Sequence, residues 1–311
     1  MSTRTTDAFD FSDISNKQEG RIANQVHSAF EKSGMRDGIG TSRKEDKLAH
    51  VGDSHQQAQG TSIHSWGTLH KVESVARTFC RYCHVEYGVR NTNQIKPDMV
   101  RTFLSELGER NYSRNTIDNY ASALERFGVA LDRSLHQGNR AETWHREIDA
   151  VRVELVQAAP DLSAGSRAYA DPQALVDEIS NPVYRAVAGM QLNHGLRLND
   201  ALKLHEIAEN GAVLHSKGGQ VMPVNLSPEE KANLDKIGDV HISKSGYIAA
   251  LHEAAEATGQ AFTGSHGLRH NYAQAQFNGY TAQGMSRSEA LQATSEDMGH
   301  HRPDITLVYL R

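Results

Sequence analysis

Long apolar runs, multiple cysteines and a strong excess of basic charge are all missing from this sequence. No stretch approaches the ~20 apolar residues of a membrane span, and the polar, acidic segment 1–16 lacks the basic start and apolar run of a signal peptide. We therefore expect a cytoplasmic protein with no membrane partner. With only two cysteines in 311 residues, the chain is not a disulfide framework.

The two cysteines, Cys80 and Cys83, form one Cys-x-x-Cys pair. Such a pair could be redox-active or half of a zinc site, and His70 and His84 are near in sequence. No second paired motif supports a metal site, however, and both sulfurs fall on one side of an apolar-periodic segment. We favour a core role for the cysteines and assign no metal.

The net charge of −5 does not by itself indicate a nucleic-acid binder. If the protein binds DNA, it must use a local basic face on an acidic body. The sequence also contains no Gly-x4-Gly-Lys-Ser/Thr loop and no His-Glu-x-x-His pair, which are the usual marks of nucleotide and zinc chemistry. We therefore expect no cofactor.

Changes in composition and periodicity divide the chain. Residues 1–62 are polar without a sustained period, although 22–30 could form a short helix, and we interpret them as a flexible arm. Residues 63–158 show four helical stripes, with Pro97 in a first turn and Ser113 as an N-cap. Residues 159–170 fit a linker, and Asp171 opens a second domain, 171–311.

The second domain is predicted to be mainly helical with one β-hairpin. Its strands are 212–215 and 220–224, on either side of the turn 216–219. A turn at Gly195 separates two helices, and further helices are expected at 228–237, 243–258, 266–278 and 287–294. The fold class is therefore mainly α with a small β-hairpin, arranged as an all-α domain followed by a mixed α+β domain.

Four short segments of this domain concentrate cations, imidazoles and a late tyrosine. Each segment alone is typical of a surface turn or a helix surface pair. The segments are Gly195-Leu196-Arg197 with Asp200-Ala201-Leu202, the hairpin turn with Lys217, Ser265-His266-Gly267-Leu268-Arg269-His270, and Met298-Gly299-His300 followed by Tyr309.

The order and spacing of these segments resemble the catalytic signature of the tyrosine recombinase (phage integrase) family, which includes the Xer-type recombinases. The resemblance covers roughly residues 63–311 and fills all six catalytic positions. It implies that 63–158 is a SAM-like core-binding domain for DNA and 171–311 the catalytic domain. The interval from Arg269 to His300 is longer than in compact members, and the excess falls at 279–296.

The resemblance also implies a role for each residue. Tyr309 is the nucleophile, His266 its base and Lys217 the acid for the departing 5′ oxygen. Arg197 and Arg269 grip the phosphate bidentately, which suits planar guanidinium groups. His300 hydrogen-bonds the phosphate or positions the tyrosine, and Asp200 supports Arg197 or a nearby turn as a neighbouring anion.

The implied activity is site-specific DNA recombination, as in phages and mobile elements, through a 3′-phosphotyrosine without metal or ATP. The expected partners are double-stranded DNA, a homotetramer on two DNA sites, and accessory DNA-bending or directionality proteins. We expect phosphate contacts in the first domain from five cations: Lys71, Arg77, Arg81, Arg110 and Arg114.

Three other functions are compatible with parts of the pattern. A non-cleaving DNA-binding accessory factor would lack a catalytic group, and none of the six is missing. A type IB topoisomerase shares the chemistry but would relax DNA that has no specific site. A metallohydrolase would need a tight ligand set, for which His300-His301 with Asp304 is the best candidate.

Overall fold

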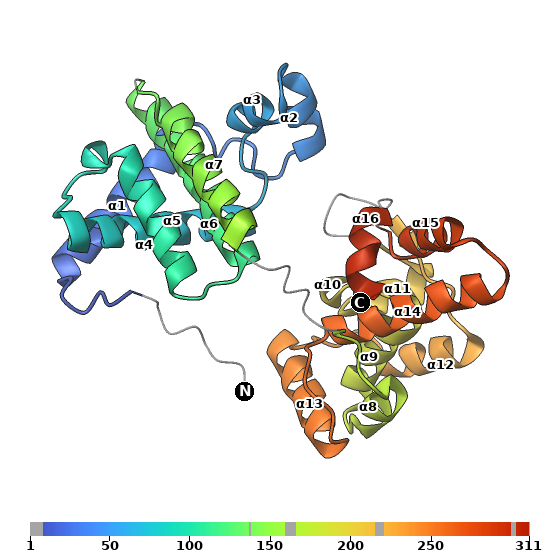
Figure 1. Ribbon diagram of the computed structural model, residues 1–311. Helices are drawn as coiled ribbons and strands as arrows, with labels where there is room; N and C mark the ends of the chain where they lie inside the picture. Colours follow the sequence, from blue (N-terminus) through green and yellow to red (C-terminus); the bar gives the residue numbers. More distant parts are fainter. Residues whose placement is uncertain (1–8, 137, 159–165, 215–220, 300–302, 311) are drawn as a thin grey trace. The chain divides into compact units, whose positions relative to one another are not determined.

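The computed structural model describes residues 9–136, 138–158, 166–214, 221–299 and 303–310. The chain divides into two compact units, residues 1–162 and 163–311, and the division falls within the segment 159–170. Each unit is described by itself (Figure 1). None of the helices in the described part of the chain is long and apolar enough to cross a membrane.

Unit 1 is entirely helical over its described residues. The helices begin where the sequence supplies caps. Ser65 accepts a hydrogen bond from Thr68 N, and Ser113, the predicted N-cap, accepts one from Thr116 N. Pro97 also occupies a first turn, as predicted. The elements are α1 Asn16–Lys32, α2 Arg43–Ala49, α3 Ser54–Gly60, α4 Trp66–Tyr87, η1 Thr92–Gln94, α5 Pro97–Glu109, α6 Arg114–Leu135 and α7 Arg140–Ala158.

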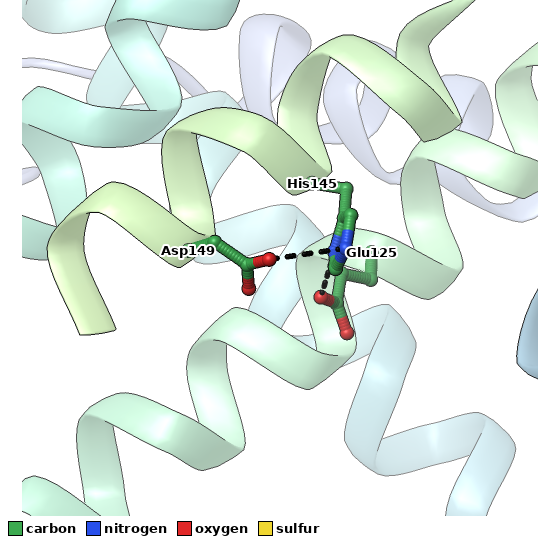
Figure 2. Close-up of side chains that lie close together, drawn as sticks. All are labelled: Glu125, His145 and Asp149. Atoms are coloured by element: carbon green, nitrogen blue, oxygen red, sulfur yellow. Dashed lines mark hydrogen bonds and ion pairs between the residues drawn. The ribbon is translucent and has the colours of Figure 1, made fainter. Parts of the chain in front are cut away.

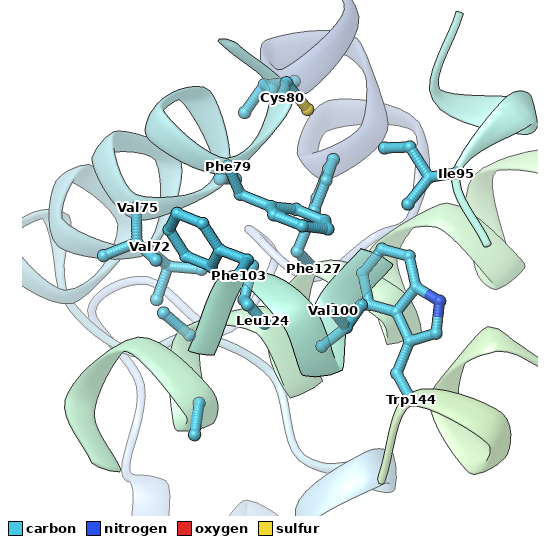
Figure 3. Close-up of a cluster of buried hydrophobic side chains, with 14 of the residues drawn as sticks. Val72, Val75, Phe79, Cys80, Ile95, Val100, Phe103, Leu124, Phe127 and Trp144 are labelled. Atoms are coloured by element: carbon cyan, nitrogen blue, oxygen red, sulfur yellow. The ribbon is translucent and has the colours of Figure 1, made fainter. Parts of the chain in front are cut away.

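Aromatic rings from four helices form the centre of this unit (Figure 3). Phe79 of α4 packs against Phe103 of α5 at 5.2 Å between ring centroids and against Trp144 of α7 at 5.8 Å. Phe127 of α6 contacts the same indole at 6.0 Å. Because all four side chains are completely buried, their packing stabilises the helices far more than helix propensity does.

The prediction that residues 1–62 form a flexible arm is wrong for the described residues 9–62. Helix α1 packs on α4 and α6, and its buried side chains are Ile22, Val26, Ala29 and Phe30. Phe9 also packs between Tyr82 and Phe103. The apolar stripe of α1 has only four members among polar residues. Its burial depends on α4 and α6 covering it, which the sequence of α1 alone does not show.

Replacing Phe30 with alanine tests this attachment. Phe30 is fully buried, 5.9 Å from Phe127 between ring centroids, so we expect unit 1 to lose about 3–5 kcal/mol of unfolding free energy. Leu48→Ala on α2 is the matched control, because Leu48 is 74% exposed. Equal, small effects of both variants in denaturant titrations would contradict the packing of α1.

Unit 2 contains the only strands of the described residues. β1 (Ala212–Leu214) and β2 (Val221–Pro223) pair antiparallel, with Val213 opposite Met222, which confirms the predicted hairpin strands. The predicted turn 216–219 lies outside the described residues. The helices are α8 Pro172–Glu178, α9 Pro182–His194, α10 Leu198–Ala201, α11 Leu204–Asn210, α12 Pro228–Ile237, α13 Lys244–Ala257, α14 His266–Ala282, α15 Arg287–Asp297, α16 Pro303–Thr306 and η2 Leu307–Leu310.

The predicted fold class is confirmed: the protein is mainly helical with one small antiparallel sheet. Asp171 caps α8 by accepting a hydrogen bond from Ala174 N at 3.0 Å, as predicted. The helix expected at 287–294 is α15, which falls mostly within the longer interval 279–296. It packs on α14, and α14 also contacts α9 and η2. Helix α14 is therefore the element on which the distant segments of unit 2 meet.

Candidate active site

The turn between α9 and α10 positions Arg197. Gly195 ends α9 with φ +61°, a left-handed conformation that favours glycine. A Cβ atom at Gly195 would lie 2.3 Å from the ring of Tyr272, so this position also requires the absence of a side chain. Arg197 then stands at the N-cap of the short helix α10, with its side chain partly exposed.

Arg269 connects three segments of unit 2 from the first turns of α14. Its side chain is completely buried. The guanidinium donates to the carbonyl oxygen of Gly195 and, at 2.8 Å, to that of Met298. Arg269 therefore fixes the Arg197 turn and the end of α15 against α14, as only a planar group with several donors can.

Tyr309 lies against the first turns of α14. Its hydroxyl is 2.9 Å from Nε2 of His266. The ring of His270 packs on the tyrosine ring at 4.6 Å, and the guanidinium carbon of Arg269 is 5.7 Å from that ring. Tyr309 is 8% exposed, so its phenol is held in place by neighbours rather than left free in solvent.

The surroundings of His266 keep its imidazole neutral. Burial, followed by the positive charges of Arg269, His270, Arg167 and Arg197, lowers the pKa of His266 to about 4. Burial and the charge of Arg167 also lower the pKa of His270. A neutral imidazole in hydrogen-bond contact with a phenol can accept the phenolic proton at neutral pH.

Four of the six predicted catalytic residues therefore meet in one place: Arg197, His266, Arg269 and Tyr309. The other two, Lys217 and His300, lie outside the described residues.

Asp200 is 1% exposed in α10. Burial lowers the pKa of Arg269, and the negative charge of Asp200 opposes that shift. Asp200 thus acts electrostatically on Arg269.

Sequence reasoning missed Gln274 and Arg167. The amide of Gln274 donates to the carbonyl oxygen of Tyr309 at 3.2 Å and to Oγ of Ser166 at 3.1 Å. The helical period could have indicated Gln274, because it lies eight residues after His266 on the same face of α14. Arg167 falls in the segment expected to be a linker, where no local pattern marks it.

The five predicted DNA-contacting cations of unit 1 differ in their surroundings. Three are ion-paired within the unit: Arg77 with Glu73, Arg81 with Glu19, and Arg110 with Glu106. Lys71 donates to Oδ1 of Asn119 at 2.7 Å, which joins α4 to α6. Arg114 is exposed at the first residue of α6.

Unit 1 holds one group with metal-ligand side chains among the described residues, Glu125, His145 and Asp149 (Figure 2). His145 Nδ1 lies 3.0 Å from Glu125 and His145 Nε2 lies 3.1 Å from Asp149. Both carboxylates also bind Arg152, at 2.9 and 3.2 Å. Because the guanidinium of Arg152 already pairs with both carboxylates, this group is best described as an ion-pair network that joins α6 to α7.

The cysteine pair lies in the core of unit 1. Cys80 and Cys83 are both buried and free. Burial raises the pKa of the Cys80 thiol to about 12 and also raises that of Cys83. Both side chains are therefore protonated at neutral pH and pack as small apolar groups.

Residues 63–134 match the model of the phage integrase N-terminal SAM-like domain. A solved structure of the site-specific recombinase XerH, bound to its palindromic difH substrate in a post-cleavage complex, is similar along almost the whole chain. The TM-score is 0.59 at 16% sequence identity, covering 96% of this chain and 94% of that one. No curated protein sequence matches the chain.

Proposed function

We propose that this chain, which has the SAM-like domain of phage integrases and the fold of a tyrosine recombinase, cuts and rejoins DNA through a covalent link to Tyr309. The observation that carries this proposal is the 2.9 Å contact between Nε2 of His266 and the hydroxyl of Tyr309. A nucleophile in contact with a neutral base is the arrangement that covalent catalysis needs.

The proposed step transfers one phosphodiester bond to the protein. His266 accepts the phenolic proton as the Tyr309 oxygen attacks phosphorus, and a 3′-phosphotyrosine forms. The 5′ oxygen departs with a proton from Lys217. Arg197, Arg269 and His300 hydrogen-bond the non-bridging oxygens, where negative charge increases in the transition state. Rejoining reverses these transfers with a new 5′ hydroxyl, so the bond energy is kept and no nucleotide is consumed.

The domains and partners follow from the same proposal. Residues 63–158 would bind duplex DNA, with α1 as part of the same helical core, and residues 171–311 would carry the chemistry. Contacts from Arg77, Arg81 and Arg110 require each guanidinium to exchange its carboxylate for a phosphate, whereas Lys71 and Arg114 need no such exchange.

Two duplexes with two strand exchanges each require four protomers, and accessory DNA-bending or directionality proteins would direct the outcome.

A DNA substrate with a nick close to the cleavage site would trap the intermediate. After cleavage, the short strand that carries the 5′ hydroxyl dissociates, so rejoining cannot occur. The substrate would come from the ends of the mobile element or replicon that carries the gene. We expect a covalent complex whose phosphopeptide contains Tyr309, and mass spectrometry would identify it. Addition of a chelator should change nothing, whereas a metallohydrolase would stop. Binding without any adduct would instead support the accessory-factor alternative.

Relaxation of plasmids that lack any specific site would favour the topoisomerase alternative. We expect little relaxation of such plasmids, because recombination requires protomers to assemble on paired sites. The control is a plasmid that carries two copies of the recombination site, on which joined products should form.

The depressed pKa of His266 predicts an unusual pH profile. An ordinary histidine, with a pKa of 6.5, would become about 90% protonated at pH 5.5 and cleavage would fall about tenfold. Because the pKa of His266 is about 4, the base stays neutral at pH 5.5, and we expect adduct formation at low DNA concentration to remain nearly flat from pH 7.5 to 5.5. A tenfold fall in that range would contradict this assignment.

A further inference from the structure

The segment 166–169 lies along one face of α14, the helix that carries His266 and Arg269. Tyr169 and Asn271 form a reciprocal pair, in which Tyr169 N donates to Oδ1 at 2.9 Å and Asn271 Nδ2 donates to the Tyr169 carbonyl at 2.8 Å. The Tyr169 hydroxyl donates to the Gly264 carbonyl at 3.1 Å. The partners of this segment are therefore Gly264, just before α14, and Asn271 and Gln274 on α14.

Gly267 allows this close approach. A Cβ atom at this position would lie 2.8 Å from the carbonyl oxygen of Arg167 and 2.6 Å from the ring of Tyr169. Real Cβ atoms do not come so near to backbone oxygen atoms. The first turn of α14 therefore has room for the segment only because residue 267 is a glycine. This close packing fixes the backbone of Arg167 against α14.

The side chain of Arg167 is held at the beginning of α14. Its Nη2 donates to the carbonyl oxygen of Thr263 at 3.0 Å, three residues before His266. The positive charge of Arg167 acts on both His266 and His270. Arg167 is exposed, and no carboxylate forms an ion pair with it in the part of the chain that the structure describes.

Positive charge therefore accumulates around His266 from three directions. Arg269 comes from α14 itself, Arg197 from the cap of α10, and Arg167 from the segment before α8. The charged groups that act most strongly on His266 are these arginines and His270, and none of them is an anion. Arg167 is exposed and Arg197 is partly exposed, so these two guanidinium groups can bind a phosphate, while the buried Arg269 adds positive charge beside them.

We propose that Arg167 is a further phosphate-binding residue of this site and contacts the DNA backbone beside His266. The inference rests on the proposed function, because it names a contact of the same site with the same substrate. Gln274 also connects segment 166–169 to the proposed nucleophile, because its amide donates both to Ser166 and to the Tyr309 carbonyl.

The first test measures adduct formation on the nicked substrate with Arg167→Gln, Arg167→Lys and a control. Arg185→Gln is the matched control, because Arg185 is also exposed and donates to a backbone carbonyl, that of Ile179 at 2.8 Å. We expect Arg167→Gln to slow adduct formation about tenfold or more, Arg167→Lys to keep part of the rate, and Arg185→Gln to match wild type. Wild-type rates for Arg167→Gln would overturn the proposal.

The pH profile separates a phosphate contact near the base from a general loss of folding. Besides Arg167, the described groups that face His266 are Arg269, His270, Arg197 and Tyr309. Removing one positive charge makes protonation of His266 easier, so the acidic limb of cleavage should move to higher pH in Arg167→Gln. It should not move in Arg185→Gln. An unmoved limb in both variants would count against the proposal.

A second test needs no DNA cleavage. Inorganic phosphate is titrated into the full-length protein while the ring signals of His266 are followed by NMR. We expect phosphate to shift them, with an affinity at least about threefold weaker in Arg167→Gln and unchanged in Arg185→Gln. No shift in the wild type, or equal affinities, would overturn the proposal. If this test succeeds while no DNA adduct ever forms, the recombinase proposal fails and the phosphate contact stands.

Discussion

Replacing Tyr309 with phenylalanine is expected to abolish covalent protein–DNA adducts while DNA binding survives. The substitution removes only the hydroxyl that would attack phosphorus, and loss of a nucleophile lowers covalent catalysis by at least about 10⁴-fold. The ring keeps its packing on His270. The hydroxyl's hydrogen bonds to His266 and to the guanidinium of Arg269 are lost, at a cost of about 1 kcal/mol each.

A matched control for this variant lies on α14, the helix against which Tyr309 packs. Tyr280 of α14 donates its hydroxyl to Asp297 at 2.7 Å, so Tyr280→Phe also removes one phenolic hydrogen bond but none of the proposed chemistry. We expect Tyr280→Phe to form adducts at the wild-type rate. Adducts formed by Tyr309→Phe on the nicked substrate would show that another residue is the nucleophile.

Replacing Arg269 with alanine should damage both the chemistry and the fold of unit 2. The guanidinium is fully buried and donates to the carbonyls of Gly195 and Met298. Its loss leaves two buried acceptors without their charged donor, which should cost about 3 kcal/mol of unfolding free energy and roughly 10 °C in Tm. Adduct formation should fall by about 10²–10³-fold or more, because a phosphate ligand is also lost.

The lysine variant distinguishes these two effects. Arg269→Lys keeps a positive charge, so its stability loss should be smaller, but an ammonium group lacks the planar set of donors that reaches both carbonyls and a phosphate. We expect its adduct formation to stay low at a temperature where circular dichroism shows the protein folded. Wild-type cleavage by Arg269→Lys would show that Arg269 does not bind the phosphate. Arg185→Ala is the control, because Arg185 is a solvent-exposed arginine.

The ion pairs of unit 1 show where residue type alone misleads. Arg77, Arg81 and Arg110 look like Arg114 in the sequence, yet each has a carboxylate partner. Glu73 and Glu106 lie four residues away on the same helix, so helical spacing could have indicated those two pairs. Glu19 reaches Arg81 from α1, and that pair depends on a helix whose packing no local pattern revealed.

Local patterns by themselves predicted helices α4 to α7 of unit 1, most helices of unit 2, the caps at Ser113 and Asp171, and the strands of the hairpin. These features depend on interactions within a few residues, which periodicity and turn chemistry record directly. The order of the motifs around Arg197, His266, Arg269 and Tyr309 also predicted a recombinase-like fold, and the chain is similar in fold to XerH.

Only the tertiary structure decided that α1 belongs to the core, that Arg269 is fully buried, that Arg167 acts on His266, and that Gln274 contacts Tyr309. Each depends on chain segments about 30 to 110 residues apart meeting on α6 or α14, and local periodicity does not show which distant segments meet. The low pKa of His266 has the same origin, because burial and three arginines from separate segments produce it together.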